Sequence, residues 1–284
     1  MFDFELENAS GNIVNINDGV KYIVVPPVSG LNPPSATLFM SKSPNGKGSK
    51  HNGSTLDERP VLITIKILGD IEKNRNALYE WIDTEQYIKI RYRNGVKNVY
   101  IEGIVQDCPI DLFTDNEVVS LSVTCGDPYW KELQDIVTEI SALLKQFIFP
   151  FAIDNYGEPF STLRESNTTN VFNSGAETGL KISVKAVKAI KNLMIYDAND
   201  TTRILKINGT IPEDYTLEID TESSPKTIKA KTPEGKFVNY MRYVSGRPTW
   251  FTLRKGHNLF GYSAETGESE AEVTISFTNK YLGV

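Results

Sequence analysis

Short apolar runs recur at close spacing through the second half of this chain, with turn residues between them. Two of the turns are Asn208-Gly209 and Pro233-Glu234-Gly235. Strands this short need a second layer to cover their apolar faces, so residues 152–284 are predicted to form a β-sandwich or jelly roll. The candidate strands cover residues 180–187, 192–196, 204–207, 215–219, 227–230, 250–253, 258–262 and 271–277.

Residues 1–132 indicate a smaller β domain with one helix. Asn94-Gly95 lies between two alternating segments, which is a strong short-range hairpin signal. Asp70 is placed to cap a helix over 71–83, because Leu78 and Ile82 give that segment an apolar face at helical spacing. We therefore expect a small sheet or a split β-barrel with one helix against it. Its main candidate strands are 59–68, 87–93, 97–106 and 118–124.

Residues 133–151 show a different periodicity. Apolar residues recur there every three or four positions, which is typical of a helix. Pro150 would end that helix. We expect a helix over 133–148 to connect the two domains. The residues that carry this pattern are Leu133, Ile136, Val137, Ile140, Leu144, Phe147 and Ile148.

Residues 28–59 form a long polar segment rich in Ser, Pro, Gly, Asn and Lys. An irregular stretch of this length is uncommon in a compact domain. It predicts either a mobile surface loop or an arm that orders against a neighbouring subunit. The second reading is preferred, because Leu38, Phe39 and Met40 interrupt the polar run and are candidate interface residues.

The charge pattern argues against tight binding of nucleic acid. The formal net charge is -6, from 36 acidic and 30 basic residues, and no basic run stands out. Binding through phosphates needs a concentrated positive face. The acidic first residues do not resemble a secretory signal peptide, and no stretch approaches the about 20 apolar residues of a membrane span. We expect a protein made and folded in a cytosol.

The residues that usually carry chemistry form no familiar set. His51 lies in the polar segment and His257 in a predicted turn, which are poor places for a catalytic base. Cys108 and Cys125 lie on a predicted hairpin, more than about 20 Å apart, so we expect two inert thiols. We predict no catalytic, cofactor or metal site.

Three weaker motifs lead to the same prediction. Around Asp197 a calcium loop would need Gly at its sixth position and Glu at its twelfth, and Thr202 and Asn208 stand there. Residues 45–50 lack the first Gly of a phosphate-binding loop. The acidic cluster at 265–272 could hold a glycosidase carboxylate pair, but a solvated face explains it better.

An alternative function is binding of cell-wall glycan by the second domain. Exposed aromatic residues bind sugars in this way, and Trp250 and Tyr262 are the candidate contacts. Trp250 and Phe251 are adjacent, so on a strand one of them should point inward and the other outward.

A series of short motifs resembles the distal tail protein family of long-tailed phages of Gram-positive bacteria. In chain order the first are Asn8–Gly11, Gly30-Leu31, Trp81 and Asp127-Pro128-Tyr129-Trp130. Each motif is weak by itself, and their order over nearly the whole chain makes the resemblance specific. The later motifs are Asn173-Ser174-Gly175-Ala176-Glu177-Thr178, Leu217-Glu218-Ile219-Asp220-Thr221, Gly235-Lys236-Phe237-Val238-Asn239, Trp250-Phe251-Thr252-Leu253, Gly256-His257-Asn258 and Tyr281-Leu282-Gly283-Val284.

The resemblance implies a tail-tube-like first domain and a galectin-like or carbohydrate-module-like sandwich. It also implies a structural subunit of the virion tail tip, or baseplate, synthesised in the host cytoplasm. Six copies would form a ring between the tail tube protein and the tail hub, a tail-associated lysin-like protein. The tape measure protein and receptor-binding proteins are further implied partners. DNA would cross the ring without specific binding, so we expect an acidic or neutral channel wall.

Overall fold

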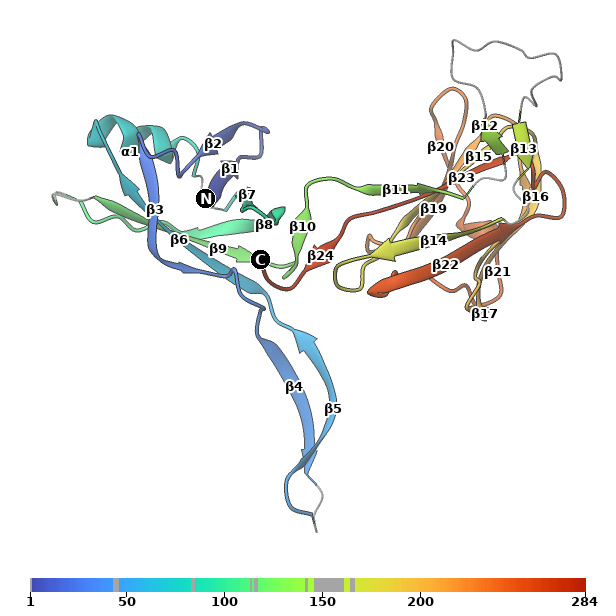
Figure 1. The fold of residues 1–284 in the computed structure, drawn as a ribbon, viewed down its shortest axis with the longest axis horizontal. Helices are drawn as coiled ribbons and strands as arrows, with labels where there is room; N and C mark the ends of the chain where they lie inside the picture. Colours follow the sequence, from blue (N-terminus) through green and yellow to red (C-terminus); the bar gives the residue numbers. More distant parts are fainter. Residues whose placement is uncertain are drawn as a thin grey trace. The chain divides into compact units, whose positions relative to one another are not determined.

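The structure is a computed structural model that describes residues 2–42, 46–82, 85–112, 114, 117–140, 143–145, 161–163 and 167–284. The chain divides into two compact units (Figure 1). Unit 1 comprises Met1–Leu133 together with Lys280–Val284, and unit 2 comprises Gln134–Asn279. The chain therefore leaves unit 1 once and returns to it for its last five residues.

Unit 1 is built on one antiparallel sheet. Its strands run in the order β2-β1-β7-β8-β9-β6-β3, and β10 joins β8 to β24. In the described residues the sheet does not close on itself, because β2 and β3 lie at its two ends. The strands are β1 (Asp3–Glu7), β2 (Ile13–Asn15), β3 (Tyr22–Ser29), β6 (Arg59–Ile67), β7 (Tyr87–Arg93), β8 (Asn98–Asp107), β9 (Val118–Cys125), β10 (Trp130–Glu132) and β24 (Lys280–Tyr281).

Helix α1 (Ile71–Tyr79) covers one face of this sheet (Figure 1). Asp70 caps it as predicted, since its side chain accepts a hydrogen bond from the backbone N–H of Lys73. The helix is shorter than the predicted 71–83. Leu78 is fully buried in the core of unit 1, where the inward residues of the alternating strands meet it.

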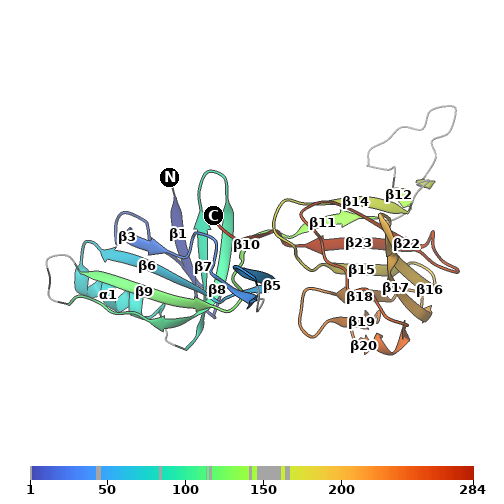
Figure 2. The same ribbon diagram turned by 90° about the horizontal axis from the view of Figure 1, so that it is seen from below.

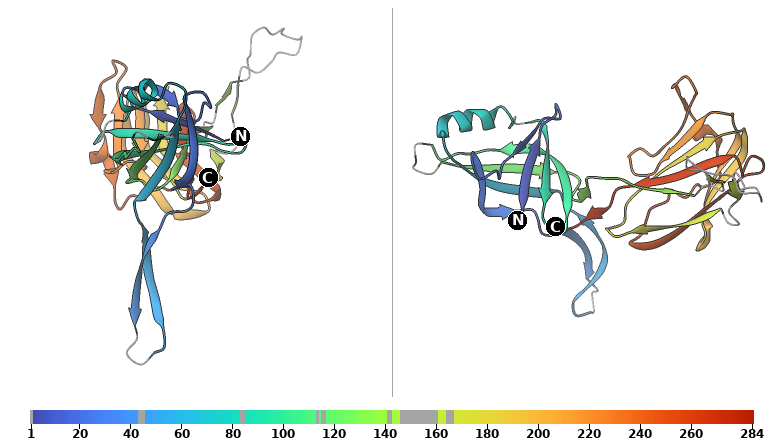
Figure 3. Two further views of the ribbon diagram at one scale, coloured as in Figure 1. Left: turned by 90° about the vertical axis from the view of Figure 1, so that its left-hand side faces the viewer. Right: turned by 45° about the horizontal axis from the view of Figure 1, so that its top comes forward.

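Two strands between β3 and β6 form a separate ribbon, β4 (Ala36–Lys42) and β5 (Ser49–Leu56). The ribbon extends away from the sheet of unit 1 (Figures 1 and 3). The long segment 28–59 is therefore paired β structure in its described part, where an irregular loop was one of the expectations. The backbone pairing from Ala36↔Leu56 to Lys42↔Ser49 satisfies the polar groups that a solvent-exposed coil would leave to water.

Unit 2 is a β-sandwich of two antiparallel sheets. We name the first the β15 sheet, with the order β11-β23-β15-β18-β19-β20, and Figure 2 shows these strands side by side. We name the second the β16 sheet, with the order β14-β22-β16-β17-β21. The strands of the β15 sheet are β11 (Ile136–Glu139), β15 (Lys181–Ala186), β18 (Thr216–Asp220), β19 (Thr227–Lys231), β20 (Phe237–Asn239) and β23 (Ala271–Phe277).

The strands of the β16 sheet are β14 (Thr168–Asn173), β16 (Ile190–Asp197), β17 (Asp200–Ile211), β21 (Val244–Ser245) and β22 (Gly256–Ser263). A 3-10 turn η1 (Met241–Tyr243) precedes β21, and β12 (Leu143–Lys145) pairs with β13 (Ser161–Leu163). Alternate residues of both sheets point inward and form one core, as the period-two pattern predicts. The predicted mainly β fold class is confirmed.

The predicted helix over 133–148 is wrong. Residues 136–139 are strand β11, which pairs with the edge of β23 from Ile136↔Phe277 to Glu139↔Thr274. Residues 141–142 and 146–148 of the predicted helix lie outside the described residues. The edge of β23 supplies backbone hydrogen-bond partners, and no local periodicity could reveal that edge. The sandwich thus begins at Gln134, ahead of the predicted 152.

Candidate assembly surfaces

The β4–β5 ribbon exposes three large apolar side chains. Leu38, Phe39 and Met40 are 59%, 50% and 51% exposed. Strand alternation places Leu38 and Met40 on one face and Phe39 on the other. Phe39 lies opposite Gly53, where there is no side chain to cover it. An isolated two-stranded ribbon is marginal in water. Apolar residues on both of its faces make the ribbon a candidate interface.

Arg59 lies at the root of the ribbon, at the start of β6, and is 1% exposed. Its guanidinium donates to backbone carbonyls: Nη1 to Gly30 and Asn32, each at 2.6 Å, Nη2 to Leu282 at 2.6 Å, and Nε to Pro128 at 2.7 Å. Burial lowers the pKa of Arg59. A buried cation is tolerated only when its donors are satisfied, and here carbonyl dipoles satisfy them.

These carbonyls come from three separate parts of the chain. Gly30 and Asn32 precede β4, Pro128 precedes β10, and Leu282 follows unit 2 in the sequence. The indole Nε1 of Trp130 also donates to Gly30 O, at 3.1 Å. Gly30 has φ of +90°, and an added Cβ would lie 2.8 Å from Pro60 O, so glycine is required there. We call this arrangement the Arg59 root.

Residues 280–284, which we call the return segment, complete the root. β24 pairs with β10, and the backbone N–H of Val284 donates to Leu31 O at 3.0 Å. Lys131 and Lys280 lie 2.8 and 3.8 Å from the Asp127 carboxylate. Burial alone would raise the pKa of Asp127, but the hydrogen bond from Lys131 and both positive charges lower it. The segment that follows unit 2 thus holds the base of the ribbon.

The face of the unit 1 sheet opposite α1 is polar and carries both signs of charge. Glu7 on β1 pairs across the strands with Arg91 at 2.5 Å and Lys89 at 3.6 Å, and Lys89 also pairs with Glu102 at 3.3 Å. Asp3 and Arg93 lie 2.8 Å apart. The face therefore has its charges compensated locally and offers no concentrated positive surface to DNA.

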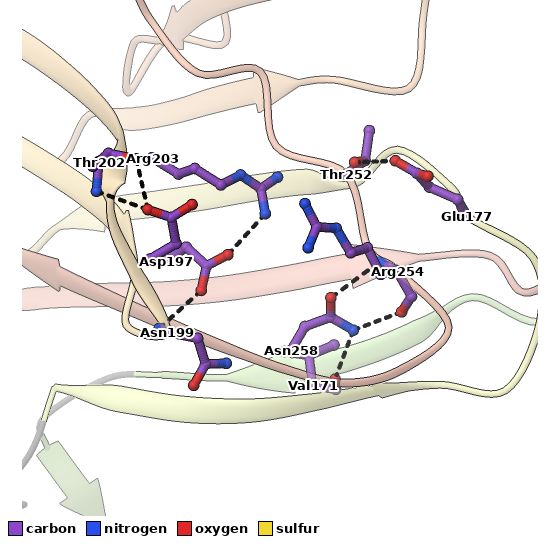
Figure 4. A network of polar contacts seen from close by, with 10 residues as sticks. Val171, Glu177, Asp197, Asn199, Thr202, Arg203, Thr252, Arg254 and Asn258 are labelled. Atoms are coloured by element: carbon purple, nitrogen blue, oxygen red, sulfur yellow. Dashed lines mark hydrogen bonds and ion pairs between the residues drawn. The ribbon is translucent and has the colours of Figure 1, made fainter.

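In unit 2, the Asp197 turn is closed by its own polar groups (Figure 4). The Asp197 carboxylate accepts from the backbone N–H of Asn199 at 3.0 Å and pairs with Arg203 at 2.8 Å. Asp200 accepts from Thr202. Nothing in the described residues gathers three or more His, Cys, Asp or Glu side chains around a metal position. The turn is a hydrogen-bonded connection between β16 and β17.

Asn258, in the Gly256-His257-Asn258 motif, organises a second turn in the same view (Figure 4). Its amide nitrogen donates to the carbonyls of Arg254 at 2.8 Å and Gly256 at 3.0 Å, and its oxygen accepts from Arg254 N at 3.0 Å. The amide thereby replaces backbone partners that the chain lacks as it enters β22.

The two predicted glycan contacts, Trp250 and Tyr262, have different environments in the structure. Tyr262 is 1% exposed, and its hydroxyl donates to the carbonyls of Glu268 and Ala271, so the expectation of an exposed ring is wrong. Its position on β22 points inward, and the opposing sheet covers it. Phe251 is fully buried and Trp250 is partly buried against the same core. Residues 250–252 form no strand, so the predicted strand at 250–253 and its inward and outward pair are wrong. A role for Trp250 in sugar contact stays a prediction.

The thiols and histidines occupy different environments. Both cysteines are free, and burial raises the pKa of Cys108 to about 11 and that of Cys125 to about 12. Both thiols are therefore protonated, and poorly nucleophilic, at neutral pH. His51 lies on β5 and His257 on β22, where its Nδ1 is 2.7 Å from Asn170. Within the described chain, no helix is long and apolar enough to cross a bilayer.

Sequence reasoning missed the Arg59 root. Arg59 was assigned to a strand, but its role depends on carbonyls from three distant segments. One usable signal was present: an arginine opens the most strongly β-branched run in unit 1. A charged residue at the head of a core strand often needs a specific partner set.

Residues 173–281 match the family model described as the siphovirus-type tail component, C-terminal domain. Most of unit 2 is therefore similar to this domain. The resemblance to distal tail proteins inferred from the sequence motifs is confirmed by this match, which covers residues 173–281, and by the similar fold of a solved phage tail protein.

Two solved structures resemble the chain over its length. The Dit protein of phage SPP1, described as a paradigm of the hub adsorption apparatus in phages infecting Gram-positive hosts, has a TM-score of 0.69 at 14% identity and covers 98% of this chain and 99% of its own. A chain of the phage P2 baseplate in its activated conformation with Ca has a TM-score of 0.53 at 11% identity, with 100% of both chains covered. At these identities the likeness concerns the fold. No curated protein matches the sequence.

Proposed function

We propose that this tail component is the subunit of a homohexameric ring at the tail tip. The ring joins the tail tube protein to the tail hub, and the tail component domain docks receptor-binding or other peripheral baseplate proteins. The tape measure protein and DNA occupy the channel. The chain acts by assembly, without catalysis. The observation that carries this proposal is the β4–β5 ribbon, which exposes Leu38, Phe39 and Met40 while its root is tightly held.

The combination of a fixed root and exposed apolar residues along β4 supports an intersubunit arm. A ribbon that only filled space would expose polar residues on both faces, because exposed apolar groups promote aggregation. The neighbour in the ring covers the ribbon, so burial of these side chains contributes to association at about 25 cal/mol per Å². The arm is therefore the main source of affinity between subunits.

The channel wall follows from the same arrangement. The polar face of the unit 1 sheet, with its Glu7, Lys89 and Arg91 pairs, faces the channel. Its compensated charges let DNA pass without condensing on the wall, because no row of unpaired cations displaces the counterions of DNA.

The proposal is tested by the mass and symmetry of the purified protein. Light scattering after size exclusion should give six times the chain mass, and negative-stain micrographs should show six-fold rings. A matched sample with Leu38, Phe39 and Met40 changed to Ser should remain in smaller species. A chain that is monomeric at all concentrations, and absent from a ring in isolated tails, would sink the proposal.

The channel prediction has its own measurement. Labelled duplex DNA should not be retained by the ring at physiological salt. Glu7→Lys together with Glu102→Lys should produce salt-dependent retention, since both changes leave nearby basic residues uncompensated. Strong retention by the unmodified ring would show that another, basic surface meets the DNA.

A further inference from the structure

The outer face of the β15 sheet carries a cavity that assembly does not explain. Its volume is about 410 Å³, within the range of small-ligand sites. The cavity spans the strands, from Ser276 on β23 across β15, β18 and β19 to Phe237 on β20. A sheet face that is simply solvated has no need of a hollow that crosses several of its strands.

The charged groups of this cavity alternate in sign. Lys181 lies directly opposite Asp220, and Glu218 lies opposite Lys229 on the next strand. In the part of the chain that the structure describes, Lys181, Glu218 and Lys229 form no ion pair within 4 Å and no side-chain hydrogen bond, although the charge of Lys181 helps to lower the pKa of Asp220. The cavity thus offers donors and acceptors side by side, with little net charge.

A cross-strand ion pair does form elsewhere on the same face of the sheet. Lys185 lies on the same strand and the same face as Lys181, four residues further along, and it pairs with Glu272 at 3.1 Å. The sheet therefore allows cross-strand ion pairs to form, and Lys181, Glu218 and Lys229 remain available to a ligand. Asp220 already accepts hydrogen bonds from the backbone N–H groups of Glu222 and Ser223. Small hydroxyls at Ser183 and Ser276 line the same hollow and leave its floor open.

The cavity has an aromatic residue at one end and a smaller hollow beside it. Phe237 is 57% exposed on the edge strand β20 and lines one end. A smaller hollow of about 60 Å³ shares Lys181 and Ser276 with the cavity and continues from it toward Glu222. The two hollows adjoin at these shared residues, which favours an extended ligand over a compact one.

We propose that this cavity binds a neutral oligosaccharide chain. A polyhydroxylated ligand presents donors and acceptors together, which is what alternating ammonium and carboxylate groups require. An anionic ligand would meet Glu218 and Asp220, and a cationic ligand would meet both lysines, so either would be repelled by half of the site. The Phe237 ring offers an apolar surface for the C–H face of a sugar. This site lies on the β15 sheet, away from the β22 residue Tyr262, and it does not depend on ring formation.

The test uses the full chain and four neutral probes: lactose, cellobiose, maltose and N,N′-diacetylchitobiose. Saturation-transfer NMR and calorimetry at millimolar sugar should detect at least one of them. Phe237→Ala and Glu218→Ala should each weaken that sugar by about fivefold or more, because each removes a contact of about 1 kcal/mol. Phe172→Ala on β14, which is similarly exposed in the other sheet, and Glu234→Ala in a turn should leave the affinity unchanged.

Two results would contradict the proposed sugar-binding site. One is that none of the four sugars binds the unmodified chain. The other is that a sugar binds with equal affinity to the wild type, Phe237→Ala and Glu218→Ala, which would place its contacts elsewhere. Thermal unfolding of each variant, matched to the wild type, separates loss of the site from loss of the fold. A ring that assembles but binds no sugar would end this inference and leave the proposed function standing.

Discussion

Two arginines, one in each unit, show two ways to hold a cation inside this protein. Arg203 pairs with Asp197, six residues earlier, on the hairpin that both residues build. Arg59 has no carboxylate among its hydrogen-bond acceptors and is held by carbonyls of Gly30, Asn32, Pro128 and Leu282. The first contact closes a local turn, whereas the second joins segments separated by most of the chain. A cation held by carbonyls can therefore organise tertiary structure as strongly as an ion pair.

Removal of Arg59 should have the largest effect on the free energy of unfolding. Arg59→Met leaves several buried carbonyls without donors, and we expect a loss of about 3–5 kcal/mol in urea unfolding of unit 1. Arg59→Lys should recover part of this loss, since an ammonium keeps the charge but lacks the planar fork. Equal stability of the wild type and Arg59→Met would mean that the root is not a stabilising element.

Truncation after Asn279 should have the second-largest effect on the free energy of unfolding. It removes the β24–β10 pairing and the Leu282 acceptor, and we expect a cost of about 2–3 kcal/mol. Hydrogen exchange should speed up at residues 30–32 and 126–130, while strands β15 and β18 of unit 2 keep their protection. Faster exchange throughout unit 2 would argue against a role confined to the root.

Loss of the Asp197–Arg203 pair should cost less. Asp197→Asn keeps the size of the side chain and weakens a partly exposed pair, so we expect about 1 kcal/mol. The double variant with Arg203→Met should show coupling between the two positions in a mutant cycle. If Asp197→Asn lowered the free energy of unfolding as much as Arg59→Met, the local ion pair and the long-range carbonyl contacts would be equally important for stability.

Substitution of the exposed apolar residues of β4 should have the smallest effect on the free energy of unfolding. Changing Leu38, Phe39 and Met40 together to Ser should alter the free energy of unfolding of the isolated subunit by no more than about 0.5 kcal/mol, because all three are exposed. The same variant should lose assembly in light scattering. Val96→Ser, at a turn residue that is 88% exposed, is the matched control and should keep both properties.

The elements predicted correctly are those whose signals are local. Asn94 and Lys97 close the β7–β8 hairpin through the backbone and through the Asn94 side chain, as the Asn-Gly turn predicts. Alternation in β15, β18 and β23 identified the sandwich because each strand has one face in the core. These features depend on neighbours a few residues apart.

The missed elements depend on distant partners. Residues 136–139 have an apolar spacing that suits a helix, and pairing with β23 makes them a strand. The ribbon strands contain few alternating apolar residues, because no core lies beside them. A tyrosine can lie at a protein surface or in a core, and in this protein the facing sheet buries Tyr262.

The sequence by itself determined a mainly β protein with two cores, a capped helix and a sandwich, because periodicity and turn chemistry act over a few residues. The tertiary structure alone decided which carbonyls accept hydrogen bonds from Arg59 and which charged residues of the β15 sheet form no ion pair. Backbone carbonyls are present at every position, so no residue type marks the ones that a buried cation will find. Register between strands far apart in the chain sets the charges around the cavity, and register is fixed only when the whole sheet assembles.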